Sequence, residues 1–327
     1  MIATDYIQWA TNYYQHRYDV CEIAWNTYYN TMSSIRSFNR FCDELKKGDV
    51  EADEKLFTAY RTWCIDKGNK PSTINQKLIP LLSGIKKVEG NKSLDKLYYD
   101  HHQRRYGAAK DDSMTVRYLT DYQLRQLLQY YQSIPEGREK ECLELFLFSF
   151  HTCGLRVSDI ITLEWRHINF QLETLSKMMV KTKGIITLPL SKTALEILLK
   201  RKALGRGRRF VFGLLPDSFD ITDAAALSQS IDHKNRYIRE ILNRVGQRLS
   251  IPFPLGMHVA RHTFAVMALN EADVNVHMIS RLLGHSSVSV TEKVYAKFLL
   301  STLSKELRSR LSFSEFSINR RGLESHF

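Results

Sequence analysis

The sequence predicts a mainly α-helical fold with one small antiparallel β-sheet, divided into two domains. Along most of the 327 residues, apolar side chains recur at steps of three and four, which is typical of amphipathic helices. Residues 176–190 change to short runs that suit strands. The small, polar residues 107–113 indicate a linker. We therefore expect a helical domain over residues 1–106, a larger domain over 114–311, and a C-terminal tail over 312–327.

The N-terminal domain is expected to contain four helices. Their apolar periodicity places them at Tyr6 to Tyr18, Trp25 to Lys46, Lys55 to Lys67 and Ser72 to Val88. Pro71-Ser-Thr is a suitable start for the fourth helix, and Gly90-Asn is a suitable stop.

The second domain is expected to open with a helix that Thr120 caps and that continues through Tyr131. A second helix is predicted from Arg138 to His151, and a third, after Gly154, is expected to carry Arg156, Ser158 and Asp159. Two strands, Lys177 to Gly184 and Ile185 to Leu190, should meet at a Lys-Gly turn. After Thr193 the helical pattern returns, interrupted by the basic loop at residues 205–209.

The charge is unevenly distributed along the chain. The formal net charge is +12, of which +2 falls in residues 1–112 and +10 in the remainder. A basic excess of this kind suits a polyanionic partner, and nucleic acid before a membrane. A basic protein without such a partner would show the same balance.

Composition also bears on the compartment. The five cysteines are scattered without a CxxC pair, which argues against a zinc knuckle and against a secreted disulfide framework. The N-terminus lacks the features of a signal peptide, and the most apolar run, Leu143 to Phe150, is too short to span a bilayer. We expect a cytoplasmic protein without membrane contact.

The chemistry is concentrated in His258-Val-Ala-Arg261-His262-Thr-Phe-Ala. His258 and Arg261 are three residues apart on a predicted helix, so both can donate to one phosphate. A helix face that is only exposed to solvent could carry the same pair of residues. His258 and His262 have the spacing of a zinc-binding helix. Val259 replaces the glutamate of a metalloprotease, however, and no third ligand lies nearby, so a metal site is rejected.

A second group of polar residues follows within forty positions. Gly284 is suited to end a helix in the left-handed conformation, which would turn His285 into a cleft. Ser289-Val-Thr-Glu292 resembles a capping box for the next helix, which carries Tyr295. A phenol can attack a phosphodiester, and an arginine and a histidine can neutralise the oxygens of the pentacoordinate phosphorus. Most tyrosines are packing residues, and Tyr295 stands out only by its distance from His285.

Together with two upstream segments, these motifs resemble the tyrosine recombinase (phage integrase) family. Gly154-Leu-Arg156-Val-Ser-Asp159 is similar to the first arginine motif, and Lys181 precedes Leu188-Pro-Leu190 as the hairpin lysine of the family does. The runs around Arg261 and from Leu283 to Tyr295 are similar to the second and third motifs. The N-terminal region resembles the core-binding domain more loosely, and its length favours the simple Xer or Cre type.

The resemblance implies a role for each of six residues. It implies no metal, no other cofactor and no need for ATP. Tyr295 would attack phosphorus to form a 3′-phosphotyrosine, while Arg156 and Arg261 would hold the non-bridging oxygens. His285 would add a hydrogen bond, His258 would accept or relay the tyrosine proton, and Lys181 would protonate the departing 5′-oxygen. Lys183 is an alternative acid, and His262 is given a supporting role.

The implied architecture is a two-domain clamp on double-stranded DNA that carries a specific recombination site. A homotetramer on two DNA sites would supply the four strand cuts, with the amphipathic segment 299–311 docked on a neighbouring protomer. Arg206, Arg208 and Arg209 of the basic loop could contact phosphates. The event could be integration, excision, inversion or dimer resolution. A topoisomerase of type IB, which relaxes DNA without a fixed site, and a catalytically silent DNA-binding protein are the alternatives.

Overall fold

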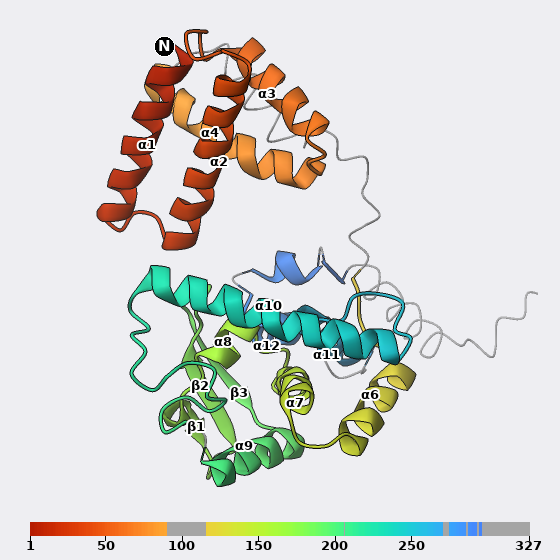
Figure 1. Cartoon of the computed structure of the whole chain (residues 1–327). Coiled ribbons are helices and arrows are strands. Elements are labelled where there is room, and N and C mark those ends of the chain that lie inside the picture. Colours follow the sequence, from red (N-terminus) through yellow and green to blue (C-terminus); the bar gives the residue numbers. More distant parts are fainter. Residues whose placement is uncertain (90–115, 206, 271–274, 286, 293, 296–327) are drawn as a thin grey trace, which may run out of the picture. The chain divides into compact units, whose positions relative to one another are not determined.

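The computed structural model divides the chain into two compact units, Met1–Ser113 and Met114–Phe327 (Figure 1). It describes residues 1–89, 116–205, 207–270, 275–285, 287–292 and 294–295. The fold is mainly helical with one three-stranded antiparallel sheet, which confirms the predicted fold class. The predicted linker at 107–113, the segment 299–311 and the tail at 312–327 lie outside the described residues.

Within residues 1–89 the first unit contains the four expected helices, α1 (Ala3–Asp19), α2 (Trp25–Glu44), α3 (Glu54–Asp66) and α4 (Pro71–Glu89). Helix α1 begins three residues earlier than its apolar pattern suggests, and α2 ends two residues earlier. Phe38 and Phe57 stack with their ring centroids 5.2 Å apart in the buried core. The hydroxyls of Tyr6 and Tyr14 on α1 donate to the carbonyls of Leu81 and Pro80, respectively, and so join α1 to α4.

The second unit places its elements around a buried helix. Their order is α6 (Asp121–Ser133), α7 (Arg138–His151), α8 (Val157–Ile161), η1 (Trp165–His167), β1 (Ile168–Asn169), β2 (Thr174–Met178), β3 (Ile185–Pro189), α9 (Lys192–Leu204), α10 (Ala224–Arg248), α11 (Met257–Asn270) and α12 (Val276–Leu282). Thr120 caps α6 in a capping box with Gln123, as expected for its N-terminus. Helix α7 packs against α9, α10 and α11 (Figure 1). All of residues 142–149 are buried. The most apolar run of the sequence is therefore the centre of this unit.

The sheet differs from the expected hairpin in its position. Strand β2 ends at Met178 rather than near Gly184, so residues 179–184 form the turn, and Lys181 lies in that turn as expected. The pairs Leu175↔Leu188 and Lys177↔Ile186 fix the register, and Lys177 occupies a buried position. A lysine on the interior face obscures the alternation by which a strand is recognised. Lys183 adopts a φ of 57°, which is typical of a turn.

Three further expectations about local structure were wrong. Arg156 is not inside a helix but is the extended N-cap residue of α8. The cap after His285 is Ser287, whose hydroxyl accepts from the backbone N–H of Ser289 at 3.2 Å. The non-helical segment after α9 continues to Asp223, because the Asp217 carboxylate accepts two backbone N–H groups, those of Arg208 and Arg209, and holds the loop closed.

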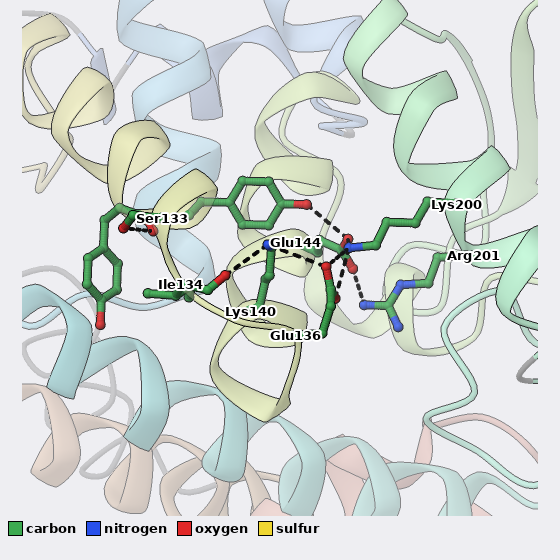
Figure 2. Close-up of polar contacts among 9 residues, drawn as sticks. Ser133, Ile134, Glu136, Lys140, Glu144, Lys200 and Arg201 are labelled. Carbon is green, nitrogen blue, oxygen red and sulfur yellow. Dashed lines mark hydrogen bonds and ion pairs between the residues drawn. The ribbon is translucent and has the colours of Figure 1, made fainter.

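A buried carboxylate joins α7 to α9 (Figure 2). The side chain of Glu144 is 2% exposed and forms ion pairs with Lys200 and Arg201 of α9. Lys200 also binds the exposed Glu136, with Nζ and Oε1 separated by 3.0 Å. Because two cations converge on Glu144, this network holds α9 against the central helix.

No helix in the described part of the chain combines the length and the apolar character that a membrane span requires.

Candidate functional site

The Arg261 side chain joins three segments of the second unit. It projects from α11 and is 6% exposed. Its Nη1 donates to the carbonyl of Gly154 at 2.8 Å, in the turn after α7, and its Nη2 donates to the carbonyl of Leu283 at 2.6 Å, at the end of α12. Nη2 also lies 3.0 Å from Nε2 of His285. Within the part of the chain that the structure describes, these hydrogen bonds fix the position of the guanidinium without a carboxylate.

The turn that receives Arg261 requires glycine. Gly154 has a φ of +73°, and a Cβ there would lie 3.0 Å from Cγ of Arg261 and 3.1 Å from its Cα. The turn therefore lets α11 approach the end of α7 closely. Two residues later Arg156 leaves the turn in an extended conformation, which places it beside the same site.

Arg156 is half-buried and contacts the end of α12. Its Nη2 donates weakly to the carbonyl of Gly284 at 3.5 Å, and Nη1 lies 3.4 Å from Sδ of Met179 in the β2–β3 turn. Burial lowers the pKa of both site arginines, and for Arg261 the charge of Arg156 adds to this effect and lowers the pKa to about 10. Both guanidinium groups are therefore charged at neutral pH. Two neighbouring cations favour an anionic ligand.

The imidazole of His285 is held in one tautomer. Arginine can only donate, so Nε2 of His285 accepts from Arg261. The proton of the neutral ring is then on Nδ1, which donates to Oγ1 of the buried Thr291 at 2.7 Å. Burial, followed by the charges of Arg261 and Arg156, lowers the pKa of His285 to about 4. The ring is therefore neutral and presents a lone pair at Nε2 in this state.

Asp159 positions the turn that carries Lys181. Its Oδ1 accepts the backbone N–H of Val180 at 2.8 Å, next to the lysine. The buried Lys177 donates to the carbonyl of Asp159 at 2.9 Å and to Thr162, so β2 is tied to α8 from the other side. Burial lowers the pKa of Lys177 to about 8, against the opposing attraction of Asp159. No role could be predicted for Asp159, because its partner can be identified only once the hairpin is placed.

Lys181 itself is exposed at the edge of the site. Burial and the charges of the site arginines lower the pKa of His285 most, and the charge of Lys181 adds to this effect. Lys181 also contributes to the lowered pKa of His258. Lys183, the alternative, is likewise exposed and is not among the main charges that lower the pKa of either histidine. A hollow of about 890 Å³ lies between this turn and α12 and is lined by Gly284 and His285.

Tyr295 lies at the buried end of the site. It is 1% exposed, and its ring packs in an apolar cluster with Val266, Leu269, Ile279 and Leu283. Burial raises the pKa of the phenol to about 12, although the charge of Arg261 opposes this rise. The tyrosine is therefore fully protonated at neutral pH.

The hydroxyl of Tyr295 binds His262 rather than His258. The Tyr295 oxygen and Nδ1 of His262 are 2.7 Å apart. His258 lies one turn earlier on α11, with an exposed ring whose centroid is 6.3 Å from that of His262. Burial, then the charges of His258 and Arg261, lower the pKa of His262 to about 4. The sequence had given this histidine only a supporting role.

The predicted site residues thus fall into two groups. Arg156, Arg261 and His285 meet at the end of α12, and Tyr295 is bonded to the residue that follows Arg261. Lys181 and His258 border this centre, but within the described residues no hydrogen bond joins either of them to the other four.

The basic loop is only partly available to a ligand. The Arg209 guanidinium is directed inward, where it binds Glu164 with Nε and Oε1 3.0 Å apart and donates to the carbonyl of Phe219. Arg208 is exposed, and Arg206 lies outside the described residues. Because the buried Glu164 carboxylate binds its side chain, Arg209 is less available to a phosphate than the exposed Arg208.

Comparison with known sequences gives the same family as the motifs. A family model described as the phage integrase family matches residues 117–299. Tyrosine recombinase XerC of Bacillus subtilis (strain 168) is 25% identical over 296 residues, which cover 89% of each chain. XerC of Thermodesulfovibrio yellowstonii is 30% identical over 155 residues, so the match spans 47% of this chain and about half, 48%, of that relative.

Comparison with solved structures shows the same fold. The Tn1549 transposon integrase in complex with transposon right end DNA has a TM-score of 0.66 at 14% identity, covering 94% of this chain and 99% of that one. XerH site-specific recombinase bound to palindromic difH substrate has a TM-score of 0.62 at 17% identity, covering 86% and 79%.

Proposed function

Because the chain belongs to the phage integrase family and is a tyrosine-type site-specific recombinase, we propose that it cleaves and rejoins a specific duplex DNA site through a covalent 3′-phosphotyrosine at Tyr295, without a metal ion or ATP. One observation supports this most strongly. Two charged arginines meet beside a buried tyrosine, and the more buried of them is held by backbone carbonyls rather than by a carboxylate.

The arginines supply the electrostatic part of the reaction. As Tyr295 attacks, the non-bridging oxygens of the phosphodiester gain negative charge, and Arg156 and Arg261 lie where they can stabilise it. His285 would join them after taking up a proton at Nε2. The negative charge of bound phosphate favours this uptake, since it raises the pKa of the imidazole.

Proton transfers complete the step. The bond between phosphorus and the tyrosine oxygen forms, the bond to the 5′-oxygen breaks, and Lys181 gives that oxygen a proton. His258 would accept or relay the tyrosine proton. Lys181 is preferred over Lys183 because its charge acts on both His258 and His285. The phosphotyrosine conserves the bond energy, so rejoining by a second 5′-hydroxyl needs no ATP.

The partner would be double-stranded DNA carrying a recombination site, as in the complexes of the structural relatives. Residues 1–106 would serve as a core-binding domain and residues 114–311 as the catalytic domain, which together clamp the duplex. Recombination requires four strand cuts, so we propose a homotetramer on two sites.

The test begins without a known site. The protein is incubated with a pool of randomised duplexes in EDTA and without ATP, and the DNA that remains attached in detergent is sequenced. A duplex with the recovered site and a nick beside the cleavage position then traps the adduct. We expect a peptide containing Tyr295 linked to a 3′-phosphate by mass spectrometry.

Tyr295→Phe should form no adduct, whereas Tyr122→Phe, which changes a 69% exposed tyrosine of the same unit, should behave as the wild type. An adduct that persists in Tyr295→Phe would contradict the proposal, as would the absence of any adduct from the wild-type protein.

A further inference from the structure

We propose that His262 is a catalytic residue that accepts the phenolic proton of Tyr295 at Nδ1 during DNA cleavage. This inference rests on the function proposed above and assigns the base within it. Its starting point is the 2.7 Å separation between Nδ1 and the tyrosine oxygen, a distance at which a proton can pass directly between the two atoms.

The surrounding packing fixes this pair. The Tyr295 ring is enclosed by apolar side chains and meets the His262 ring edge-on, with centroids 5.8 Å apart. His262 directly follows Arg261 on α11, so the same helix carries the proton acceptor and a cation that would hold the phosphate. The hydrogen bond therefore joins the nucleophile to the element that would bind the scissile group.

The charges nearby set the direction of the hydrogen bond. Burial and the neighbouring positive charges lower the pKa of His262 to about 4, so the ring is neutral at pH 7. A neutral ring with an unprotonated Nδ1 accepts from the phenol. When a phosphodiester occupies the site, its negative charge raises the pKa of His262 and favours the imidazolium that proton transfer creates.

The proton balance closes within the chain. The Tyr295 oxygen loses its proton to Nδ1 as it bonds to phosphorus, and the 5′-oxygen leaves with a proton from Lys181. His262 can then release the Nε2 proton to solvent, directly or by way of the exposed His258. In rejoining, Nε2 takes up a proton from solvent, directly or by way of His258, and Nδ1 returns its proton to the departing tyrosine oxygen.

Three variants separate a base from a structural residue. His262→Leu removes the acceptor, and His262→Asn keeps a polar atom near the position of Nδ1 but cannot be protonated. His233→Gln changes an exposed histidine on α10 and serves as the control. In single-turnover experiments we expect the DNA cleavage rate of the first two variants to fall by about 100-fold or more, and the rate of the control to match the wild type.

The leaving group provides a second readout. In a DNA substrate whose bridging 5′-oxygen is replaced by sulfur, the departing thiolate needs no proton. Lys181→Ala should be slow on the oxygen substrate and recover on the sulfur substrate. The His262 variants should remain slow on both, because their defect is on the side of the nucleophile.

A third readout changes the acidity of the nucleophile. Fluorotyrosine placed at position 295 loses its proton more readily than tyrosine. The reduction in cleavage rate caused by His262→Asn should therefore be smaller with fluorotyrosine than with tyrosine. This comparison uses His262→Asn protein that binds the DNA site with wild-type affinity. It is therefore valid even if His262→Leu fails to fold.

His262→Asn cleaving at the wild-type rate would overturn the inference, since positioning alone would then suffice. An unchanged defect with fluorotyrosine, or rescue of the His262 variants by sulfur, would also overturn it. In each of these cases wild-type protein that forms the Tyr295 adduct leaves the proposed function intact, whereas a wild-type protein without an adduct overturns both.

Discussion

His262 and His285 remain neutral in the folded protein, with pKa values lowered to about 4 by burial and by neighbouring cations. Histidines of the unfolded chain take up protons near pH 6.5. Between pH 6.5 and 4 the unfolded state therefore binds more protons than the native state, and the free energy of unfolding falls as the pH falls.

We expect acidification from pH 7 to pH 5 to cost roughly 1 kcal/mol for each of the two histidines, allowing for their partial exposure. Urea unfolding of the wild type and of His262→Asn at both pH values measures this. The variant should lose about 1 kcal/mol less than the wild type, and His233→Gln should lose as much as the wild type. Equal losses in all three proteins would contradict the prediction.

The motifs of the sequence were sufficient to place Arg156, Arg261 and His285 in one site, because each lies next to a glycine turn or on one face of a helix. The contact between His262 and Tyr295 could not be predicted in this way. It joins residues 33 positions apart and depends on how the tyrosine ring packs under α12. The same holds for Asp159, whose partner lies across the hairpin turn.

The end of α12 depends on Gly284, which has a φ of +62° and lies against the end of the Met179 side chain. A Cβ at this position would lie 2.5 Å from Sδ of Met179, the atom that contacts Arg156. Gly205, at the end of α9, has the same φ of +62° but nothing within 4 Å of a Cβ.

We therefore expect Gly205→Ala to cost about 1 kcal/mol of stability from backbone strain alone. Gly284→Ala should cost more and should also slow DNA cleavage at least tenfold, because Met179 and Arg156 must shift. Thermal unfolding and single-turnover cleavage of both variants make the comparison. Equal behaviour of the two would show that the close approach to Met179 is unimportant.

The joint between α7 and α9 offers a similar contrast. Removing Glu144 leaves Arg201, whose side chain is 5% exposed, as an uncompensated buried cation, which typically costs about 3 to 5 kcal/mol. The side chain of Glu136 binds the same Lys200 but is 64% exposed, so its loss should cost no more than about 1 kcal/mol.

Urea unfolding of Glu144→Ala and Glu136→Ala tests this prediction. A loss below about 1 kcal/mol in Glu144→Ala would mean that the joint is not important for stability.

Helix periodicity predicted the helices of both units well, but the strands were displaced. Strand β2 carries Lys177 on its buried face, and the hydrogen bonds that make this acceptable come from Asp159 and Thr162 on another element. A strand stabilised by such distant partners cannot be identified from alternation alone.

Over the complete chain, the excess of positive charge should make DNA binding depend strongly on salt. Affinity for the recovered site should fall about 1,000-fold or more between 50 and 200 mM salt if at least six phosphates are contacted. Arg208→Ala should reduce the slope of log K against log salt by about 1 if this exposed arginine binds a phosphate.

Arg209→Ala provides the internal control for this measurement, because Arg209 pairs with the buried Glu164 and its loss should lower stability instead of the slope. A slope near zero for the wild type would contradict the proposed contact with the DNA backbone.

The hydrogen bonds of Arg261 have a consequence for the ligand. A guanidinium has five N–H donors, and Gly154, Leu283 and His285 take three of them in the described part of the chain. Two remain, one on Nε and one on Nη1, and they point to different sides of the guanidinium, so in this state Arg261 can offer a phosphate its charge and single hydrogen bonds but not a forked contact. The protein therefore uses most of the hydrogen-bonding capacity of this arginine to hold its own helix ends together. Arg261 can consequently bind a phosphate only as long as α7, α11 and α12 keep their places, and this makes the site sensitive to any movement of these helices.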